Sequence, residues 1–212
     1  MTTLFRNRIA AGQQLATELE AYANQADVIV LALPRGGVPV AYEVAQALNL
    51  PLDICLVRKL GLPGQKEFAM GAIASGGVRL VNEELIHTLA IPQKTIAEVE
   101  ALELKELERR DRVYRGDRPL PLLQNRTVIL IDDGLATGAT MRAAIAVVKS
   151  QHAKQIVVAV PVAPESACKE LTAQVDQVIC LLKPTPFHAI GSWYENFDQI
   201  SDDEVTRLLA QS

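Results

Sequence analysis

TVILIDDGLATGAT, residues 127–140, is the stretch that decides the fold, because an apolar run leads into two acids and then into small residues. The first five residues are β-branched or leucine, which is typical of a buried strand. Met141, Ile145 and Val148 then share one face at helical spacing. The stretch therefore predicts a strand, a glycine-rich turn and a helix in succession.

Apolar runs of strand length recur on both sides of this unit, and helical patterns separate them. The expected strands are residues 28–33, 52–57, 155–162 and 177–182, and the expected helices are residues 9–23, 38–48, 92–115 and 202–210 and a helix that begins near Pro164. Strands that alternate with helices favour a parallel sheet covered on both faces. We therefore expect an α/β fold, a doubly wound and mostly parallel sheet flanked by helices, in one domain over residues 1–212.

The middle of the chain departs from this alternation. Residues 58–69, RKLGLPGQKEFA, hold two glycines and a proline among charges, which favours a mobile surface loop. Two short apolar runs follow at 70–74 and 78–81, and Ser75-Gly76-Gly77 joins them. A glycine turn between two such runs predicts a hairpin.

Composition restricts the class of protein. Hydrophobic types make up 49% of the chain and charged types 22%, a balance that excludes intrinsic disorder. Lys plus Arg is 21 against 25 for Asp plus Glu, a net charge of −4 that disfavours bulk electrostatic binding to DNA or to an anionic membrane. No run approaches the roughly 18 apolar residues of a membrane span. The 3 cysteines form no CxxC pair, so we expect a soluble, cytoplasmic protein.

Ligands of an open α/β sheet bind at the carboxyl ends of its strands, so the turn after residue 131 is the leading candidate site. Small residues at 136–140 open the following helix, where backbone N–H groups suit a phosphate. Asp132 and Asp133 leave the expected strand just before this turn, within reach of hydroxyl groups on a sugar. The alternative is that the two acids form an ordinary turn and that Thr137 or Thr140 caps the helix.

The spacing of apolar run, acid pair and Thr-Gly resembles the signature of type I phosphoribosyltransferases, which bind phosphoribosyl pyrophosphate. Pro34-Arg35-Gly36-Gly37, after the first expected strand, resembles the pyrophosphate loop of that family. Arg58 and Lys59, followed by residues 61–68, match the position of its mobile catalytic lid, so 58–69 is the expected lid loop. The alternative for Arg58 and Lys59 is a solvated charge pair at a strand end.

The resemblance implies a role for each of these groups. Asp132 and Asp133 would contact the ribose hydroxyls, and the loop would hold the 5′-phosphate through Ala136, Thr137, Gly138, Ala139 and Thr140. Arg35, Gly36 and Gly37 would bind pyrophosphate, and Arg58 and Lys59 would stabilise it as it leaves. Mg²⁺ would be bound mainly through substrate and water, with no dedicated protein ligand set.

The acceptor region is the least defined part of the resemblance. Family members that act on 6-oxopurines carry an aspartate where this chain has Ala136, yet Lys183 followed by aromatics resembles those same enzymes. Residues 183–200 match a small C-terminal hood over the acceptor base, with Lys183, Phe187, Trp193 and Tyr194 as its contacts. The alternative is that these aromatics pack the C-terminal helix onto the sheet. The group that handles the base proton stays unassigned.

The resemblance thus implies a Mg²⁺-dependent phosphoribosyltransferase. It would transfer the 5-phosphoribosyl group from phosphoribosyl pyrophosphate to a nitrogenous, nucleobase-like acceptor and release pyrophosphate. Family members are commonly homodimers, so we expect a homodimer. The alternative is a non-catalytic sensor of phosphoribosyl pyrophosphate or of a nucleotide that regulates a partner. A hydrolase is a third possibility, although no organised base for activating water is evident.

Overall fold

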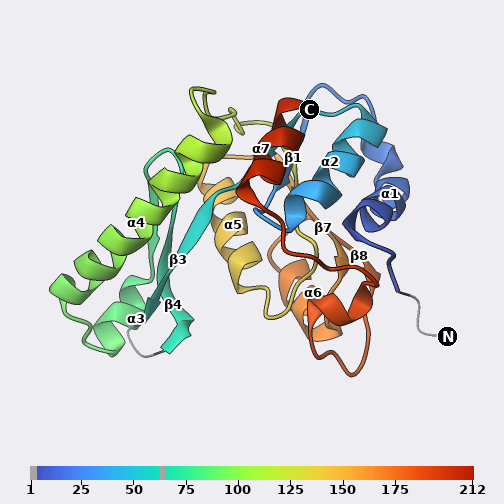
Figure 1. Cartoon of the computed structure of the whole chain (residues 1–212). Coiled ribbons are helices and arrows are strands. Elements are labelled where there is room, and N and C mark those ends of the chain that lie inside the picture. Colours follow the sequence, from blue (N-terminus) through green and yellow to red (C-terminus); the bar gives the residue numbers. More distant parts are fainter. Residues whose placement is uncertain (1–3, 63–64) are drawn as a thin grey trace.

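The computed structural model describes residues 4–62 and 65–212, with side chains for all of these except 65–68. Its centre is a five-stranded parallel sheet in the order β2-β1-β6-β7-β8 (Figure 1). The strands are β1 (Val28–Ala32), β2 (Leu52–Ile54), β6 (Thr127–Ile131), β7 (Gln155–Val162) and β8 (Gln177–Leu182). The expected parallel α/β sheet is confirmed.

Helices cover both faces of this sheet, because its central strands are apolar on both sides. On one face, Ile129 and Ile131 pack into a core shared with α1 (Arg8–Glu18), α2 (Gly37–Leu48) and α7 (Asp202–Ala210). On the other face, Val128 and Leu130 pack against α5 (Ala139–Ser150) and α6 (Glu165–Thr172). Every residue of β1 and β6 is buried, which explains their uninterrupted apolar sequences.

Strand order places the two glycine turns beside each other. β1 and β6 are neighbours; the chain leaves β1 toward β2 at one edge of the sheet and leaves β6 toward β7 in the opposite direction. Such a reversal opens a crevice at the carboxyl ends of the two strands. The turns after β1 and β6 therefore flank one point at the edge of the sheet.

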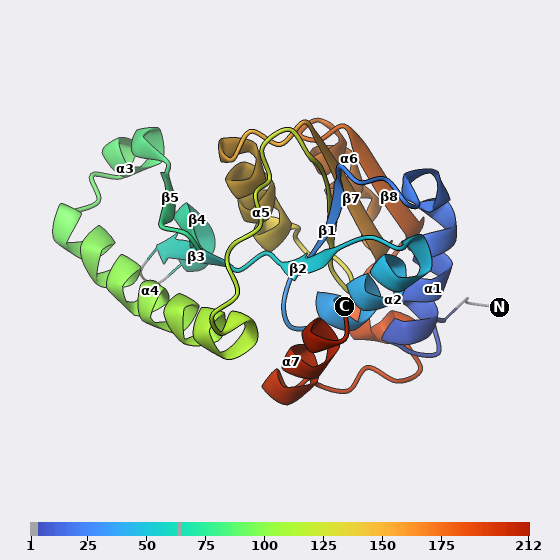
Figure 2. The same cartoon turned by 90° about the horizontal axis from the view of Figure 1, so that it is seen from above.

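A second, antiparallel sheet of three strands lies beside the first: β3 (Val57–Leu62), β4 (Gln65–Ala74) and β5 (Val78–Val81). The hairpin expected at 70–81 is confirmed as β4 and β5. With α3 (Glu83–Thr88) and α4 (Gln93–Arg115), this sheet forms a separate layer at one side of the molecule (Figure 2). The sequence pattern predicted α4 but not α3.

Two expectations for this region are wrong. Residues 52–57 are not one strand, because β2 ends at Ile54 and β3 begins at Val57. Residues 58–69 are not mainly loop, because 58–62 and 65–69 lie in β3 and β4; residues 63–64 of the expected lid lie outside the described residues. Leu60 and Met70 are fully buried, in one core with Ile96 and Leu107 of α4. Packing against α4 thus stabilises this segment as strands, although it is rich in glycine and charged residues.

The connecting segments include two short 3-10 helices, η1 (Glu20–Tyr22) and η2 (Ile190–Trp193). The expected helix 9–23 is therefore α1 followed by η1. Within the described ranges, no helix is both long enough and apolar enough to cross a membrane.

Candidate functional site

The turns after β1 and β6 are in direct contact. Leu33 N–H donates to the carbonyl of Ile131 at 2.8 Å. A Cβ on Gly36 would collide with the Asp133 carboxylate, and one on Gly37 would lie 2.7 Å from the Ile131 oxygen. Only glycine allows this approach. The Arg-Gly-Gly turn and the acid pair, far apart in the sequence, thus form one site.

The two acids differ in their surroundings. Asp132 is half-buried, and its Oδ1 accepts a hydrogen bond of 2.8 Å from Asp133 N–H. Burial and the neighbouring charge of Asp133 raise the pKa of Asp132 above its usual range. Asp133 is buried, and its Oδ2 accepts a hydrogen bond of 2.8 Å from Arg8 Nε.

The pairing with Arg8 occupies one oxygen of the Asp133 carboxylate, and the expected contact of both acids with the ribose hydroxyls stays a prediction. The side chains of Arg8 and Asp133 are only 10% and 11% exposed. The Arg8 guanidinium also donates to the Asp198 carbonyl at 2.8 Å and lies 3.8 Å from the centre of the Phe197 ring. Sequence reasoning missed Arg8, because nothing near it in the chain distinguishes it from any other helical arginine.

The proposed phosphate loop presents open backbone groups. α5 begins at Ala139, and its N-cap Gly138 has a φ of 69° and contributes no side-chain cap. Ala136, Thr137 and Thr140 are exposed. Thr137 Oγ1 makes only a long contact of 3.4 Å with Ala139 N–H. The first N–H groups of α5 consequently remain available to an anion.

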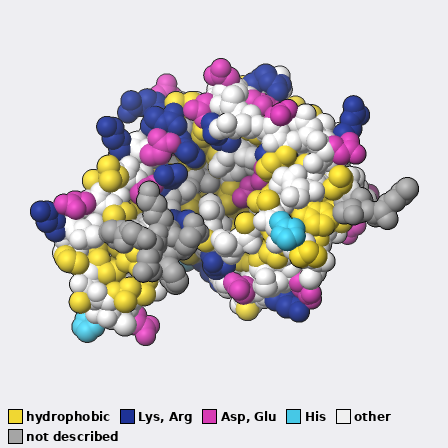
Figure 3. All heavy atoms as spheres, turned by 60° about the horizontal axis from the view of Figure 1, so that its bottom comes forward, with side chains coloured by type: hydrophobic (Ala, Val, Ile, Leu, Met, Phe, Trp, Pro, Cys, Tyr) yellow, Lys and Arg dark blue, Asp and Glu magenta, His cyan; other side chains and the backbone are white. Residues whose placement is uncertain are grey.

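A cleft of about 500 Å³ lies between α4, β3 and these turns. Pro34 and Thr140 line its side toward the parallel sheet, and Arg58 and Lys59 line it from β3. Arg58 Nε donates to Glu103 of α4 at 2.6 Å. Figure 3 shows the surface hollowed between the two parts of the molecule, with Lys and Arg side chains near its rim. The structure thus brings together Arg58, Lys59 and the start of α5.

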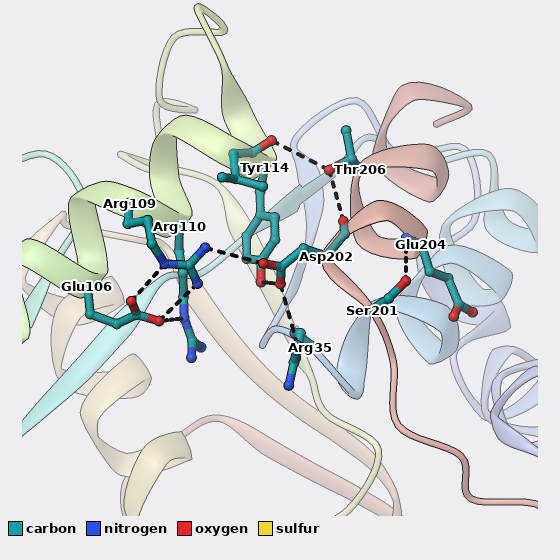
Figure 4. Close-up of polar contacts among 10 residues, drawn as sticks. Arg35, Glu106, Arg109, Arg110, Tyr114, Ser201, Asp202, Glu204 and Thr206 are labelled. Atoms are coloured by element: carbon teal, nitrogen blue, oxygen red, sulfur yellow. Dashed lines mark hydrogen bonds and ion pairs between the residues drawn. The ribbon is translucent and has the colours of Figure 1, made fainter.

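Asp202, at the start of α7, connects the Arg35-Gly36-Gly37 turn to α4 (Figure 4). Its carboxylate lies 3.6 Å from Arg35 Nη1 and accepts hydrogen bonds from Arg109 at 3.3 Å and from the Tyr114 hydroxyl. The hydrogen bond from Tyr114 is the main cause that lowers the pKa of Asp202. Sequence reasoning also missed Asp202, which there resembled an ordinary acid in the first turn of a helix.

The expected hood segment packs mainly on the N-terminal part of the chain. Tyr194 is buried, its ring centre is 5.4 Å from that of Phe5, and its hydroxyl donates to the Asp133 carbonyl at 2.6 Å. Lys183 is exposed, while Phe187 and Trp193 are partly buried in the same cluster. Tyr194 therefore stabilises the turn that carries Asp132 and Asp133, here called the acid turn, through this hydrogen bond. Because its ring is buried, no ring face is free for a ligand.

The comparisons with known proteins agree with this geometry. A family model for the phosphoribosyl transferase domain matches residues 2–191. Two Mycobacterium tuberculosis proteins, provisionally named phosphoribosyl transferases, are 44% identical over 206 residues. These matches cover 97% of this chain but 46% of each relative, so the chain spans about half the length of these curated relatives.

Solved structures extend the likeness to the fold. A crystal structure of a protein from Thermus thermophilus matches with a TM-score of 0.89 and 39% identity over 98% of both chains. A hypoxanthine-guanine phosphoribosyltransferase from Bacillus anthracis matches with a TM-score of 0.52 and 10% identity, over 88% of this chain and 85% of that one. The second match shows a shared fold alone. Taken with the family match over nearly the whole sequence, these findings mean that the chain belongs to the phosphoribosyl transferase domain family.

Proposed function

We propose that this protein transfers the 5-phosphoribosyl group from phosphoribosyl pyrophosphate to a nitrogenous, nucleobase-like acceptor with release of pyrophosphate. One observation carries the proposal: the open N-terminus of α5 and the Arg35-Gly36-Gly37 turn flank Asp132 at one edge of the sheet. Phosphoribosyl pyrophosphate carries a phosphate at one end of its ribose and a pyrophosphate at the other. Its two anionic groups would therefore meet these two turns, with the ribose beside Asp132.

The 5′-phosphate would be bound by the amides and hydroxyls of residues 136–140. Asp132 would accept a hydrogen bond from a ribose hydroxyl and stabilise the positive charge that develops on the ring in the transition state. Asp133 would act through its backbone and its pairing with Arg8, which fix the turn that carries Asp132. The acid pair would thus share one role between a contacting and a supporting residue.

The leaving pyrophosphate would lie between the Arg35-Gly36-Gly37 turn and the cleft. The amides of Gly36 and Gly37 would approach it closely, and Arg35, Arg58 and Lys59 would add positive charge. The proposed lid role of residues 58–69 is compatible with a hairpin, since β3 borders the cleft and β4 lines a neighbouring pocket beside α5. Closure of such an element excludes water, which competes as nucleophile.

Mg²⁺ fits this donor set. Among the described residues, no group of three or more His, Cys, Asp or Glu side chains is arranged to hold a metal ion. Mg²⁺ typically uses one or two carboxylates together with substrate phosphates and water, and the half-buried Asp132 can serve as such a carboxylate. When bound, the ion would neutralise charge on the pyrophosphate.

We further propose that Lys183, Phe187 and Trp193 contact the acceptor, and that the protein is a cytoplasmic homodimer. Cys55, Cys168 and Cys180 are free thiols, which suits a reducing compartment. Ile190 of η2 would touch a Cβ placed on Gly134, so this segment runs directly beside the acid turn. Its position there supports a role over the ligand.

The test is pyrophosphate release from phosphoribosyl pyrophosphate with Mg²⁺ and a panel of bases. Release that depends on a base supports the proposal. Tight binding without turnover would replace it by the sensor, and release without any base would replace it by a hydrolase.

Two variants locate the activity. Gly138→Val is expected to weaken binding of ribose 5-phosphate, because a β-branched side chain is strained at a φ of 69° and crowds the amides. Asp132→Asn is expected to lower turnover roughly 10–100-fold, the loss of one charge-assisted hydrogen bond. Asp117→Asn, on the exposed turn after α4, is the matched control. Wild-type turnover in Asp132→Asn would contradict the ribose role.

A further inference from the structure

The long helix α4 contributes a cationic residue to the wall of the cleft. Arg110 lines the cleft together with Pro34 and Thr140, and its side chain is 24% exposed. Because α4 belongs to the second layer of the molecule, Arg110 approaches the site from the side opposite the phosphate loop. It is therefore a candidate for contact with a ligand that spans the cleft.

The hydrogen bonds of Arg110 orient its guanidinium without saturating it. Nε donates to Glu106 at 2.7 Å, one turn earlier in α4. Among the described residues, Nη1 and Nη2 have no hydrogen-bond acceptor. In Figure 4 the side chain extends past Glu106 and away from Asp202. Two donors in a fixed plane match two oxygens of a phosphate group.

Arg110 also lies near the pyrophosphate loop. Arg110 shares the wall of the cleft with Pro34, the residue before Arg35, and it stands one helical turn before Tyr114 in α4. Arg35 is itself 3.6 Å from Asp202, the acceptor of Tyr114. Two arginines from different layers thus lie around one small region.

The charges that line the cleft favour an anion. Of the described residues that line it, Arg58, Lys59 and Arg110 are basic and Glu103 is acidic. Val99 and Leu102 of α4 form the apolar part of the same wall. A diphosphate, with several negative charges over a short length, complements this wall better than a single phosphate.

We infer that Arg110 is a binding residue for the pyrophosphate group of phosphoribosyl pyrophosphate, supplied by α4 from across the cleft. The inference rests on the proposed function for the identity of the ligand. It adds the second layer to the site: α4 would take part in ligand binding besides covering β3 and β4.

The experiment measures binding of three ligands by calorimetry at one salt concentration: phosphoribosyl pyrophosphate, inorganic pyrophosphate and ribose 5-phosphate. Arg110→Gln is expected to weaken binding of the first two roughly 10–100-fold and to leave ribose 5-phosphate unchanged. Arg112→Gln is the matched control, because it removes the same charge from an exposed position of the same helix. It is expected to change none of the three affinities.

The outcomes separate this inference from the proposed function. Equal affinities for pyrophosphate in wild type and Arg110→Gln would overturn the inference. A parallel loss for ribose 5-phosphate would also overturn it, since the substitution would then disturb the whole site. A wild type that binds pyrophosphate through Arg110 but transfers no phosphoribosyl group would refute the proposed function alone.

Discussion

Replacing Arg8 by methionine tests whether the acid turn depends on α1. Arg8 and Asp133 are 10% and 11% exposed, so the pair lies in the buried regime, where solvent screens it little. Arg8→Met leaves the Asp133 carboxylate buried without its cation and removes the contacts with Asp198 and Phe197. Breaking one partner of a buried ion pair costs about 3–5 kcal/mol.

Urea unfolding measures this cost. With a urea m value of about 3 kcal/mol/M, the loss corresponds to a midpoint lower by roughly 1–2 M. The control is Lys154→Met, which removes the cation from an exposed pair with Asp27 at 3.1 Å, whose side chains are 62% and 48% exposed. Exposed pairs of this kind contribute about 0–1 kcal/mol.

The double variant Arg8→Met/Asp133→Asn completes the cycle. Because it leaves no unpaired buried charge, its destabilisation is expected to be smaller than the sum of the two single losses. Strict additivity, or a midpoint for Arg8→Met no lower than that of Lys154→Met, would refute the view that this ion pair holds the acid turn in place.

Three further predictions concern single residues. Gly36→Ala is expected to destabilise the protein by about 1–3 kcal/mol, because its Cβ would collide with the Asp133 carboxylate; an unchanged Tm would contradict this contact. Asp132→Asn is expected to be more stable than wild type at pH 8 but not at pH 3. Burial and the charge of Asp133 raise the pKa of Asp132, so the folded state binds the proton more tightly and wild-type stability falls as the pH rises from the ordinary value of about 4 through the raised one. Urea unfolding at the two pH values checks the sign, and equal stabilities at pH 8 would count against it. Burial raises the pKa of Cys55 to about 12, so iodoacetamide at pH 8 is expected to label this thiol only after unfolding, as mass spectrometry would report; rapid native labelling would disprove its burial.

The parallel sheet could be predicted from the sequence because strands buried on both faces are uninterrupted runs of apolar residues. β6 and β7 consist of consecutive apolar residues, apart from polar first residues, and the breaks between them hold the turn residues. The two glycine turns were also readable, since Gly36 and Gly138 stand where a strand passes into a helix. These features depend on neighbours in the chain, which a sequence displays directly.

The second layer was harder to predict, because its stability comes from contacts that no local pattern expresses. Arg58 and Lys59 lie in β3 although their segment resembles a loop. The next residue of the strand, Leu60, is buried in one core with residues of α4, and this packing favours the strand conformation. A short sequence window registers glycine and charge but not the helix that covers them.

The acid pair shows most clearly the difference between what local sequence predicts and what depends on tertiary contacts. The sequence by itself determined that two carboxylates follow β6 and that an open helix start comes next. Only the tertiary structure decided that Asp133 pairs with Arg8, 125 residues away, and that Asp202 meets Arg35 and α4. An ion pair needs proximity in space, and proximity between distant segments exists only once the sheet order has brought their ends together.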